Sequence, residues 1–179
     1  GSTHYKRNGG EFMNIVLKPW TRKDKDILKD LCNHIDRSHL SDRIPSPYTE
    51  QDAIWWLTMV EEHEGKDGIF RAIEVDGKIV GNISVEQDSD VYKKDAAIGY
   101  FLSSDLWGKG IMSEAVNEIC KIAFQKLDIL RISGLVYSKN IASQKVLEKN
   151  NFALEGVKKC AVFKNGQIDD LCIYGKLKH

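Results

Sequence analysis

The fold is decided by the stretch Leu106-Trp107-Gly108-Lys109-Gly110-Ile111-Met112-Ser113-Glu114-Ala115-Val116, in which two glycines precede an amphipathic pattern. Upstream, residues 96–102 have the apolar, aromatic and branched composition of a buried strand, and downstream the apolar residues recur at helical spacing. The glycines therefore stand at a helix N-terminus, where unpaired N–H groups and a backbone without Cβ atoms favour an anion. The stretch predicts a loop that binds a diphosphate.

Three other interpretations of this loop stay open on the residues alone. A dinucleotide-binding loop would need a third small residue, which Ser113 supplies, but no acidic residue follows a second strand at the expected distance. A nucleotide P-loop would need Lys and then Ser or Thr after its second glycine, where Ile111 stands. An ATP- or NAD-binding protein thus rests on the glycines alone, and a simple tight turn before an ordinary helix is the third alternative.

A second run follows a strand-like segment at residues 131–136 and contains Asn140-Ile141-Ala142-Ser143. Together the two runs resemble the GNAT acyltransferase superfamily, in which a Gly-x-Gly/Ala loop holds the coenzyme A pyrophosphate and a later strand leads into an Asn-x-x-Ser helix start. The chain resembles the RimJ/RimL-type branch, which includes N-terminal acetyltransferases of ribosomal proteins, from about Ile15 to Leu177. The motifs that carry this are Ile98-Gly99-Tyr100, Trp107-Gly108-Lys109-Gly110, Val146-Leu147-Glu148-Lys149, Phe152, Glu155-Gly156, Asn165-Gly166, Asp170 and Tyr174, together with Pro45-Ser46-Pro47-Tyr48-Thr49 and Asp52-Ala53.

The resemblance implies an α+β fold, with a central mixed, mostly antiparallel sheet of about seven strands flanked by about four helices. The residue pattern agrees with an alternation of strands and helices. Thr21 and Thr49 each stand three residues before an acid, which is typical of a capped helix start. Asp76-Gly77 and Asn165-Gly166 each divide two strand-like segments and predict two-residue hairpin turns.

The resemblance also implies a coenzyme A site on the strand, the glycine loop and the second helix start. Its residues are Tyr100, Phe101, Leu102, Trp107, Gly108, Lys109, Gly110, Ile111, Met112, Ser113, Asn140 and Ser143. Asn140 would hold the pantetheine amides, and Ser143 would protonate or hydrogen-bond the leaving sulfur. Both side chains are also of the type that caps a helix, so a purely structural role is the alternative for each.

Acyl transfer to an amine requires a group that takes the amine proton. Glu86, near the end of the third strand, is the nearest carboxylate in sequence order, with water-mediated deprotonation or a merely solvated side chain as alternatives. Tyr48 is the expected substrate contact, because the two short helices face the acceptor side in the family. Two residues depart from the branch: Asp105 replaces an Arg or Gln of the phosphate loop, and Ala97 replaces a frequent Glu.

These residues favour an acetyl-CoA-dependent N-acetyltransferase that works by direct transfer in a ternary complex. Its acceptor would be a primary amine, either a protein N-terminus or a small molecule. The alternative is a non-catalytic sensor that binds coenzyme A or acyl-CoA, which the departures at Ala97 and Asp105 suggest. No spacing of His with Cys or acids predicts a metal ligand, so no metal is expected.

Composition bounds the remaining functions. The 179 residues are 42% apolar and 29% charged, which predicts one domain, and 26 basic residues balance 26 acidic ones, which speaks against nucleic acid. The sequence has neither a long apolar run nor a secretory signal, so we expect no membrane contact and a cytoplasmic location. The thiols of Cys32, Cys120, Cys160 and Cys172 are expected to be buried.

Gly1-Ser2 resembles a protease-cleavage scar, and Met13 is a possible native start. We therefore expect residues 1–12 to be tag-derived or disordered and residues 13–179 to form a single acetyltransferase domain. The terminal hairpin would offer edge strands through which a second copy could pair to form a homodimer.

Overall fold

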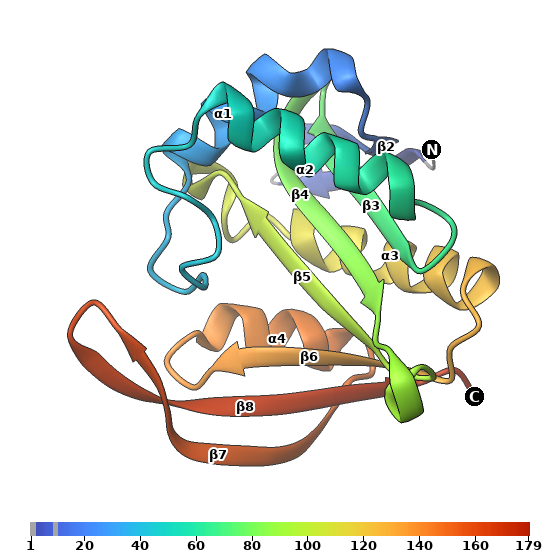
Figure 1. Ribbon diagram of the computed structural model, residues 1–179, viewed down its shortest axis with the longest axis vertical. Coiled ribbons are helices and arrows are strands. Elements are labelled where there is room, and N and C mark those ends of the chain that lie inside the picture. Colours follow the sequence, from blue (N-terminus) through green and yellow to red (C-terminus); the bar gives the residue numbers. More distant parts are fainter. Residues whose placement is uncertain (1–2, 9–10) are drawn as a thin grey trace.

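The computed structural model describes residues 3–8 and 11–179. In this part of the chain the strands form one sheet. Its strands are β1 (Thr3–Asn8), β2 (Glu11–Pro19), β3 (Gly68–Val75), β4 (Lys78–Gln87), β5 (Ala96–Leu102), β6 (Arg131–Tyr137), β7 (Ala153–Lys164) and β8 (Gln167–Leu177). They lie in the order β1-β2-β3-β4-β5-β6-β8-β7 (Figure 1). Every neighbouring pair is antiparallel except β5 with β6. The predicted mixed, mostly antiparallel sheet is confirmed.

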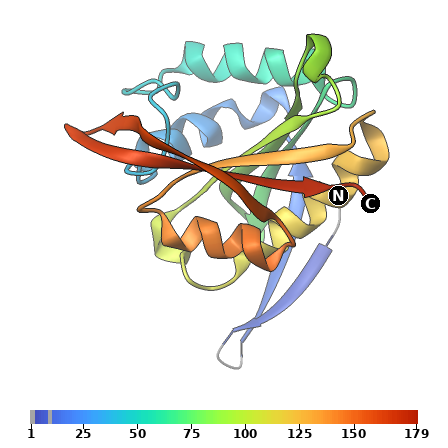
Figure 2. The same ribbon diagram turned by 90° about the horizontal axis from the view of Figure 1, so that it is seen from below.

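Within residues 3–8 and 11–179, four α-helices cover the two faces of this sheet, as predicted. They are α1 (Lys25–His34), α2 (Glu50–His63), α3 (Ile111–Lys126) and α4 (Ile141–Lys149). Helices α1 and α2 lie on one face, and α3 and α4 lie on the other (Figure 2). Strand residues alternate between two buried clusters, so Ile69 and Ile73 pack on the α3 side while Phe70 and Ala72 pack on the α1–α2 side.

Local signals in the sequence set the ends of these elements. Thr49 caps α2 through a capping box, in which its Oγ1 accepts from the Asp52 N–H at 3.2 Å and the Asp52 carboxylate accepts from the Thr49 N–H at 2.8 Å. The box at Thr21 is also present, but a 3₁₀ turn at Arg22–Asp24 separates it from α1. Both predicted hairpin turns form, and all four of their central residues have positive φ angles, as a type I′ turn requires.

The N-terminal segment contains an additional strand. Strand β1 lies within residues 1–12, which the sequence analysis set apart, and it pairs with β2 from Thr3↔Val16 to Asn8↔Glu11. Among the described residues this strand is the eighth, beyond the seven expected, and β1 with the start of β2 extends away from the rest of the molecule (Figure 2).

One of the four cysteines corrects the sequence analysis. Cys32, Cys120 and Cys172 are buried, as expected, but Cys160 is exposed. The reason is its position: Cys160 lies on the outermost strand β7, where the register shifts between Lys158 and Val162, and its φ is +55°. Among residues 3–8 and 11–179, no helix is long and apolar enough to cross a membrane.

The feature that positions the site is the separation of β5 from β6. The two strands pair at only two positions, Ala97↔Ser133 and Ile98↔Gly134. Beyond these, residues 99–102 continue to pair with β4, while residues 135–137 continue to pair with β8. The strands therefore diverge toward the side where the α1–α2 loop and the tip of the β7–β8 hairpin lie (Figure 1).

Candidate active site

Both helices that follow the diverging strands begin at the open end of the gap. Strands β5 and β6 are parallel, and a helix follows each: α3 follows β5 after a short 3₁₀ turn and the glycine loop, and α4 follows β6. The N-termini of α3 and α4 therefore lie at the same end of the gap, where their dipoles favour negative charge. Beyond their two paired positions, β5 and β6 have no ladder partner across the gap among the described residues, so an extended polar ligand can pair with the backbone of these edges.

The glycine loop brings backbone N–H groups to the start of α3. Gly108 and Gly110 have φ angles of +75° and +77°, which L-residues with a Cβ rarely adopt. The helix starts at once with Ile111, whose side chain is almost fully buried and fixes this end of α3 to the core. The first hydrogen bond of α3 runs from the Glu114 N–H to the Gly110 carbonyl at 3.3 Å, so the N–H groups of residues 111–113 have no acceptor within the helix. This geometry suits a diphosphate.

Hydrogen bonds around the loop hold it against the sheet. The Trp107 indole N–H donates to the Leu102 carbonyl at 2.9 Å, and the Ser103 N–H donates to the Val80 carbonyl at 2.8 Å. Asp105, on the 3₁₀ turn at Ser104–Leu106, is exposed and adds a negative charge near the loop. Lys109 is the basic side chain within the loop itself, so its charge and that of Asp105 oppose each other there.

The predicted residues of α4 and β5 come together. The Asn140 side chain accepts a hydrogen bond from the Ser143 N–H at 3.2 Å, so Asn140 caps α4, as its residue type predicted. The Ser143 Oγ lies 2.5 Å from the Tyr100 hydroxyl oxygen. Burial raises the pKa of Tyr100 to about 12, so this phenol is protonated at neutral pH. The family resemblance implied a coenzyme A contact for Tyr100, but nothing in the sequence indicated its hydrogen bond with Ser143.

A buried asparagine that the sequence analysis missed connects the two helices of the site. Asn150 follows α4, and its side-chain amide donates to the Ser113 carbonyl at 3.2 Å, to Ser113 Oγ at 3.3 Å and to the Val146 carbonyl at 2.9 Å. Only 6% of Asn150 is exposed. Ser113, one of the predicted coenzyme A contacts, is therefore part of the link between the first turn of α3 and the end of α4.

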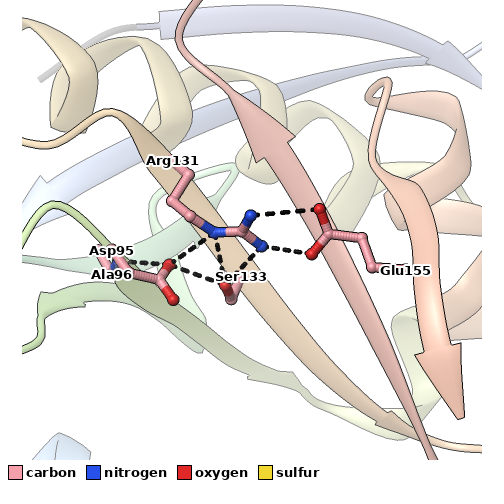
Figure 3. A network of polar contacts seen from close by, with 5 residues as sticks. All are labelled: Asp95, Ala96, Arg131, Ser133 and Glu155. Carbon is pink, nitrogen blue, oxygen red and sulfur yellow. Dashed lines mark hydrogen bonds and ion pairs between the residues drawn. The ribbon is translucent and has the colours of Figure 1, made fainter. Parts of the chain in front are cut away.

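A polar network, also missed, closes the narrow end of the gap (Figure 3). Asp95, just before β5, accepts from Arg131 Nε at 3.3 Å and from Ser133 Oγ at 2.7 Å. Arg131 also holds Glu155 of β7 through both terminal nitrogens. The hydrogen bond from Arg131 lowers the pKa of Glu155. Three strands are thereby tied together at the position where β5 and β6 meet.

Glu86 lies on the face of the sheet opposite α3. Asn82 is four residues earlier on β4, so its side chain points to the same face of the sheet as that of Glu86. The Asn82 side chain accepts a hydrogen bond from the Trp20 indole at 2.9 Å, which places Asn82 and Glu86 on the α1–α2 side. Glu86 pairs directly with Ala97 across the strands. The side chain is exposed overall, yet partial desolvation of its carboxyl raises its pKa, against the opposing effect of the positive charge of Arg43.

Two adjoining clefts lie between the α1–α2 loop and the β7–β8 hairpin. The larger has a volume of about 550 Å³ and is lined by Arg37, Ser38, Asp42, Ile44, Ser46, Lys164 and Asn165. The smaller, of about 240 Å³, shares three of these and is lined by Ser38, His39, Tyr137, Lys139, Val162, Lys164, Asn165, Gln167 and Asp169. Lys164 binds Asp42 at 2.6 Å across the two segments. Since Tyr137 ends β6, the smaller cleft adjoins the open end of the gap.

Tyr48 does not line either cleft. It is buried in the α1–α2 cluster, where its hydroxyl donates to the Asp52 carbonyl at 3.5 Å and its backbone bonds with Asn33 at 2.8 Å and 2.9 Å. The structure gives Tyr48 a packing role, and its contact with an acceptor stays a prediction. Arg37 organises the neighbouring loop by donating to the carbonyls of Cys32, Ile44 and Pro45.

Comparison with known proteins agrees with this geometry. Residues 14–153 match the family model described as "Acetyltransferase (GNAT) domain". The probable N-acetyltransferase YjcK of Bacillus subtilis (strain 168) is 37% identical over 69% of this chain and 70% of its own length.

Two solved structures share the fold. One is RimL, described as a ribosomal L7/L12 α-N-protein acetyltransferase in complex with coenzyme A, with a TM-score of 0.79 and 22% identity over 92% of this chain and 93% of that one. The other is the microcin C7 self-immunity acetyltransferase MccE in complex with acetyl-CoA and AMP, with a TM-score of 0.73 and 22% identity over 92% of each chain. At these identities the structures support the fold alone.

Proposed function

Because this chain belongs to the GNAT family of N-acetyltransferases, we propose that it transfers an acetyl group from acetyl-CoA to a primary amine by direct attack in a ternary complex. The observation that carries the proposal is the gap between β5 and β6, with the N-termini of α3 and α4 at its open end. Acetyl-CoA supplies the activated acyl group. The residues of this chain bind it, hold the amine near it and remove the amine proton.

The residues at the gap fit coenzyme A in chemical terms. The glycine loop offers left-handed backbone and free N–H groups for the diphosphate, with Gly108 and Gly110 at its centre. The separated edges at residues 99–102 and 135–137 offer backbone partners to the pantetheine amides. Asn140 caps α4 through its side-chain oxygen, which leaves its amide N–H₂ to donate to an amide carbonyl of the ligand.

Glu86 is the proposed general base. The branch often carries a Glu where this chain has Ala97, and Glu86 is the direct cross-strand partner of Ala97 on the same face. Side chains in such pairs are about 5 Å apart at Cβ, so the carboxylate of Glu86 can reach the space that a Glu at Ala97 would occupy. The pKa of Glu86 is raised toward neutral pH, and a carboxylate with a higher pKa is a stronger base for the amine proton.

The acceptor enters, in this proposal, through the two clefts between the α1–α2 loop and the β7–β8 hairpin. Their lining is polar and carries both signs of charge, including Asp42, Asp169 and Lys139, which suits a cationic amine attached to a polar body. RimL acts on a ribosomal protein, as its name states. The proposed acceptor is therefore either a protein N-terminus or a small polar amine.

The test measures release of free coenzyme A from acetyl-CoA with a panel of peptide and small-molecule amines, after calorimetry has established binding of acetyl-CoA. We expect one-to-one binding of acetyl-CoA, no binding of ATP or NAD, and amine-dependent thiol release. Binding without thiol release for any amine would contradict catalysis and leave a coenzyme A sensor. Binding of ATP or NAD instead of acetyl-CoA would contradict the assigned ligand.

The cytoplasmic location and the homodimer stay predictions of this proposal. Strand β7 forms one edge of the sheet, and its outward residues are largely exposed, which supports pairing with a second copy. Sedimentation of the purified protein distinguishes monomer from dimer.

A further inference from the structure

The hydrogen bond between the hydroxyls of Tyr100 and Ser143 has a donor and an acceptor, and the other contacts of the two hydroxyls indicate which is which. Either oxygen could donate across their distance of 2.5 Å. Within residues 3–8 and 11–179, Ser143 Oγ is the only hydrogen-bond partner of the Tyr100 hydroxyl. If Ser143 donated, the Tyr100 hydrogen would have no acceptor among the described residues, and an unpaired donor in a partly buried, desolvated position is costly.

The reverse direction pairs the Tyr100 hydrogen and leaves the Ser143 hydrogen, at the open end of the gap, without an acceptor among the described residues. Tyr100 is packed against the buried cluster under α3, and its phenol is a better donor than an alcohol. Ser143 is half-buried in the first turn of α4, at the open end of the gap. When Tyr100 donates to Ser143 Oγ, the Ser143 hydrogen is left free to turn toward a ligand in the gap.

We propose that Tyr100 is a positioning residue, which donates its hydroxyl proton to Ser143 Oγ and thereby directs the Ser143 hydroxyl hydrogen at the sulfur of a bound coenzyme A thioester. This inference rests on the proposed function. As the amine attacks, the bond from the acyl carbon to sulfur breaks and its electron pair moves to sulfur. The hydrogen bond from Ser143 stabilises that charge, and Tyr100 strengthens the bond by polarising Ser143.

No proton leaves either hydroxyl in this step. The amine proton goes to the general base, and the thiolate takes its proton from solvent after it is released. The role of Tyr100 is therefore to orient and to polarise, and it needs no further reactant.

The experiment compares Tyr100→Phe, Ser143→Ala and the double variant with wild type. Tyr174→Phe is the matched control, because the Tyr174 hydroxyl also binds α4, donating to Glu148 at 2.9 Å, but does not contact Ser143. Tyr100→Phe and Ser143→Ala should each lower kcat about tenfold with an unchanged KM for acetyl-CoA. The double variant should be no slower than Ser143→Ala, because the two groups act as one unit.

A second readout does not depend on turnover. The thiol of bound coenzyme A is titrated through the ultraviolet absorbance of its thiolate, with the ligand-free protein as background. A donor at sulfur stabilises the thiolate, so the pKa of the bound thiol should be lower in wild type than in Tyr100→Phe or Ser143→Ala, and unchanged in Tyr174→Phe.

The outcomes separate this inference from the proposed function. A wild type that binds coenzyme A but releases none with any amine contradicts the proposed function, and the thiol titration still decides the hydrogen bond. A Tyr100→Phe variant with wild-type kcat and wild-type thiol pKa overturns the inference. If the losses in kcat of the two single variants multiply in the double variant, the two residues act independently and the inference is overturned. It is also overturned if the wild-type protein does not bind coenzyme A.

Discussion

Replacing Gly134 with alanine should move α4 and disturb the site without touching a site residue. Gly134 lies on β6 where the strand meets β5, and a Cβ there would sit 2.8 Å from Leu147 Cδ1 and 3.4 Å from Ile98 Cγ2. Leu147 belongs to α4 and is 1% exposed, so it has no open space into which to turn. Ordinary carbon contacts are about 3.5–4.0 Å, so the contact with Leu147 must lengthen by about 1 Å.

The magnitude follows from two opposing effects. Alanine stabilises a strand by about 0.5–1 kcal/mol relative to glycine, but overpacking a buried contact costs about 1–3 kcal/mol. We expect a net loss of about 1 kcal/mol or more in the free energy of unfolding. If α4 moves away from Tyr100 by about 1 Å, the 2.5 Å contact of Ser143 with Tyr100 lengthens to about 3.5 Å, well beyond the usual O–H···O distance, so the hydrogen bond is greatly weakened.

Urea unfolding followed by circular dichroism measures the first effect, and initial rates of coenzyme A release measure the second. Gly134→Ala should lower both, with kcat reduced about tenfold. Leu147→Ala removes the methyl groups that clash, so Gly134→Ala should cost much less in that background than in wild type. Unchanged stability and unchanged rate would refute the reasoning. Lower stability with a full rate would show that Leu147 adjusts while Ser143 stays in place.

Further predictions concern three single residues. Glu86→Gln should lower kcat/KM by about 10²-fold or more and abolish the fall in rate as pH drops through the raised pKa of Glu86, which a pH–rate profile tests. Desolvation raises the pKa of Glu86 in the folded state, so at pH values above that pKa the ionised carboxylate lowers the free energy of unfolding. Glu86→Gln removes this charge and should therefore unfold at a higher urea concentration than wild type at neutral pH. Gly108→Ala meets no atom within 4 Å, so it should cost only the strain of its φ of +75°, about 1–2 kcal/mol, and should weaken binding of coenzyme A in calorimetry. Glu155→Gln should lose up to about 1 kcal/mol of stability, a difference that holds above the unfolded pKa and disappears as pH falls through the lowered folded pKa; a constant difference in acid would contradict the ion pair with Arg131.

What the sequence predicted well depends on neighbours along the chain. The hairpin turns at Asp76-Gly77 and Asn165-Gly166 need only two residues that accept positive φ angles, and the cap of α2 needs only a pair three residues apart. The glycine loop and its helix were predicted for the same reason, since their geometry follows from local residue types.

What the sequence could not predict depends on contacts between distant segments. Tyr100 and Ser143 are 43 residues apart, and Asp42 and Lys164 are 122 apart, so no local spacing brings either pair together. The exposure of Cys160 likewise depends on β7 lying at the edge of the sheet, which residue composition does not reveal.

The short contact between β5 and β6 has a consequence for the way in which the protein opens. Only two residue pairs join β1–β5 to β6–β8 within the sheet, so the two halves should unfold partly independently, as separate units in hydrogen exchange. A ligand that pairs with both separated edges would act as the missing strand and couple the two units. At a hundredfold excess over Kd such a ligand adds about 2.7 kcal/mol of stability, and amide protection should then spread across residues 99–102 and 135–137 together.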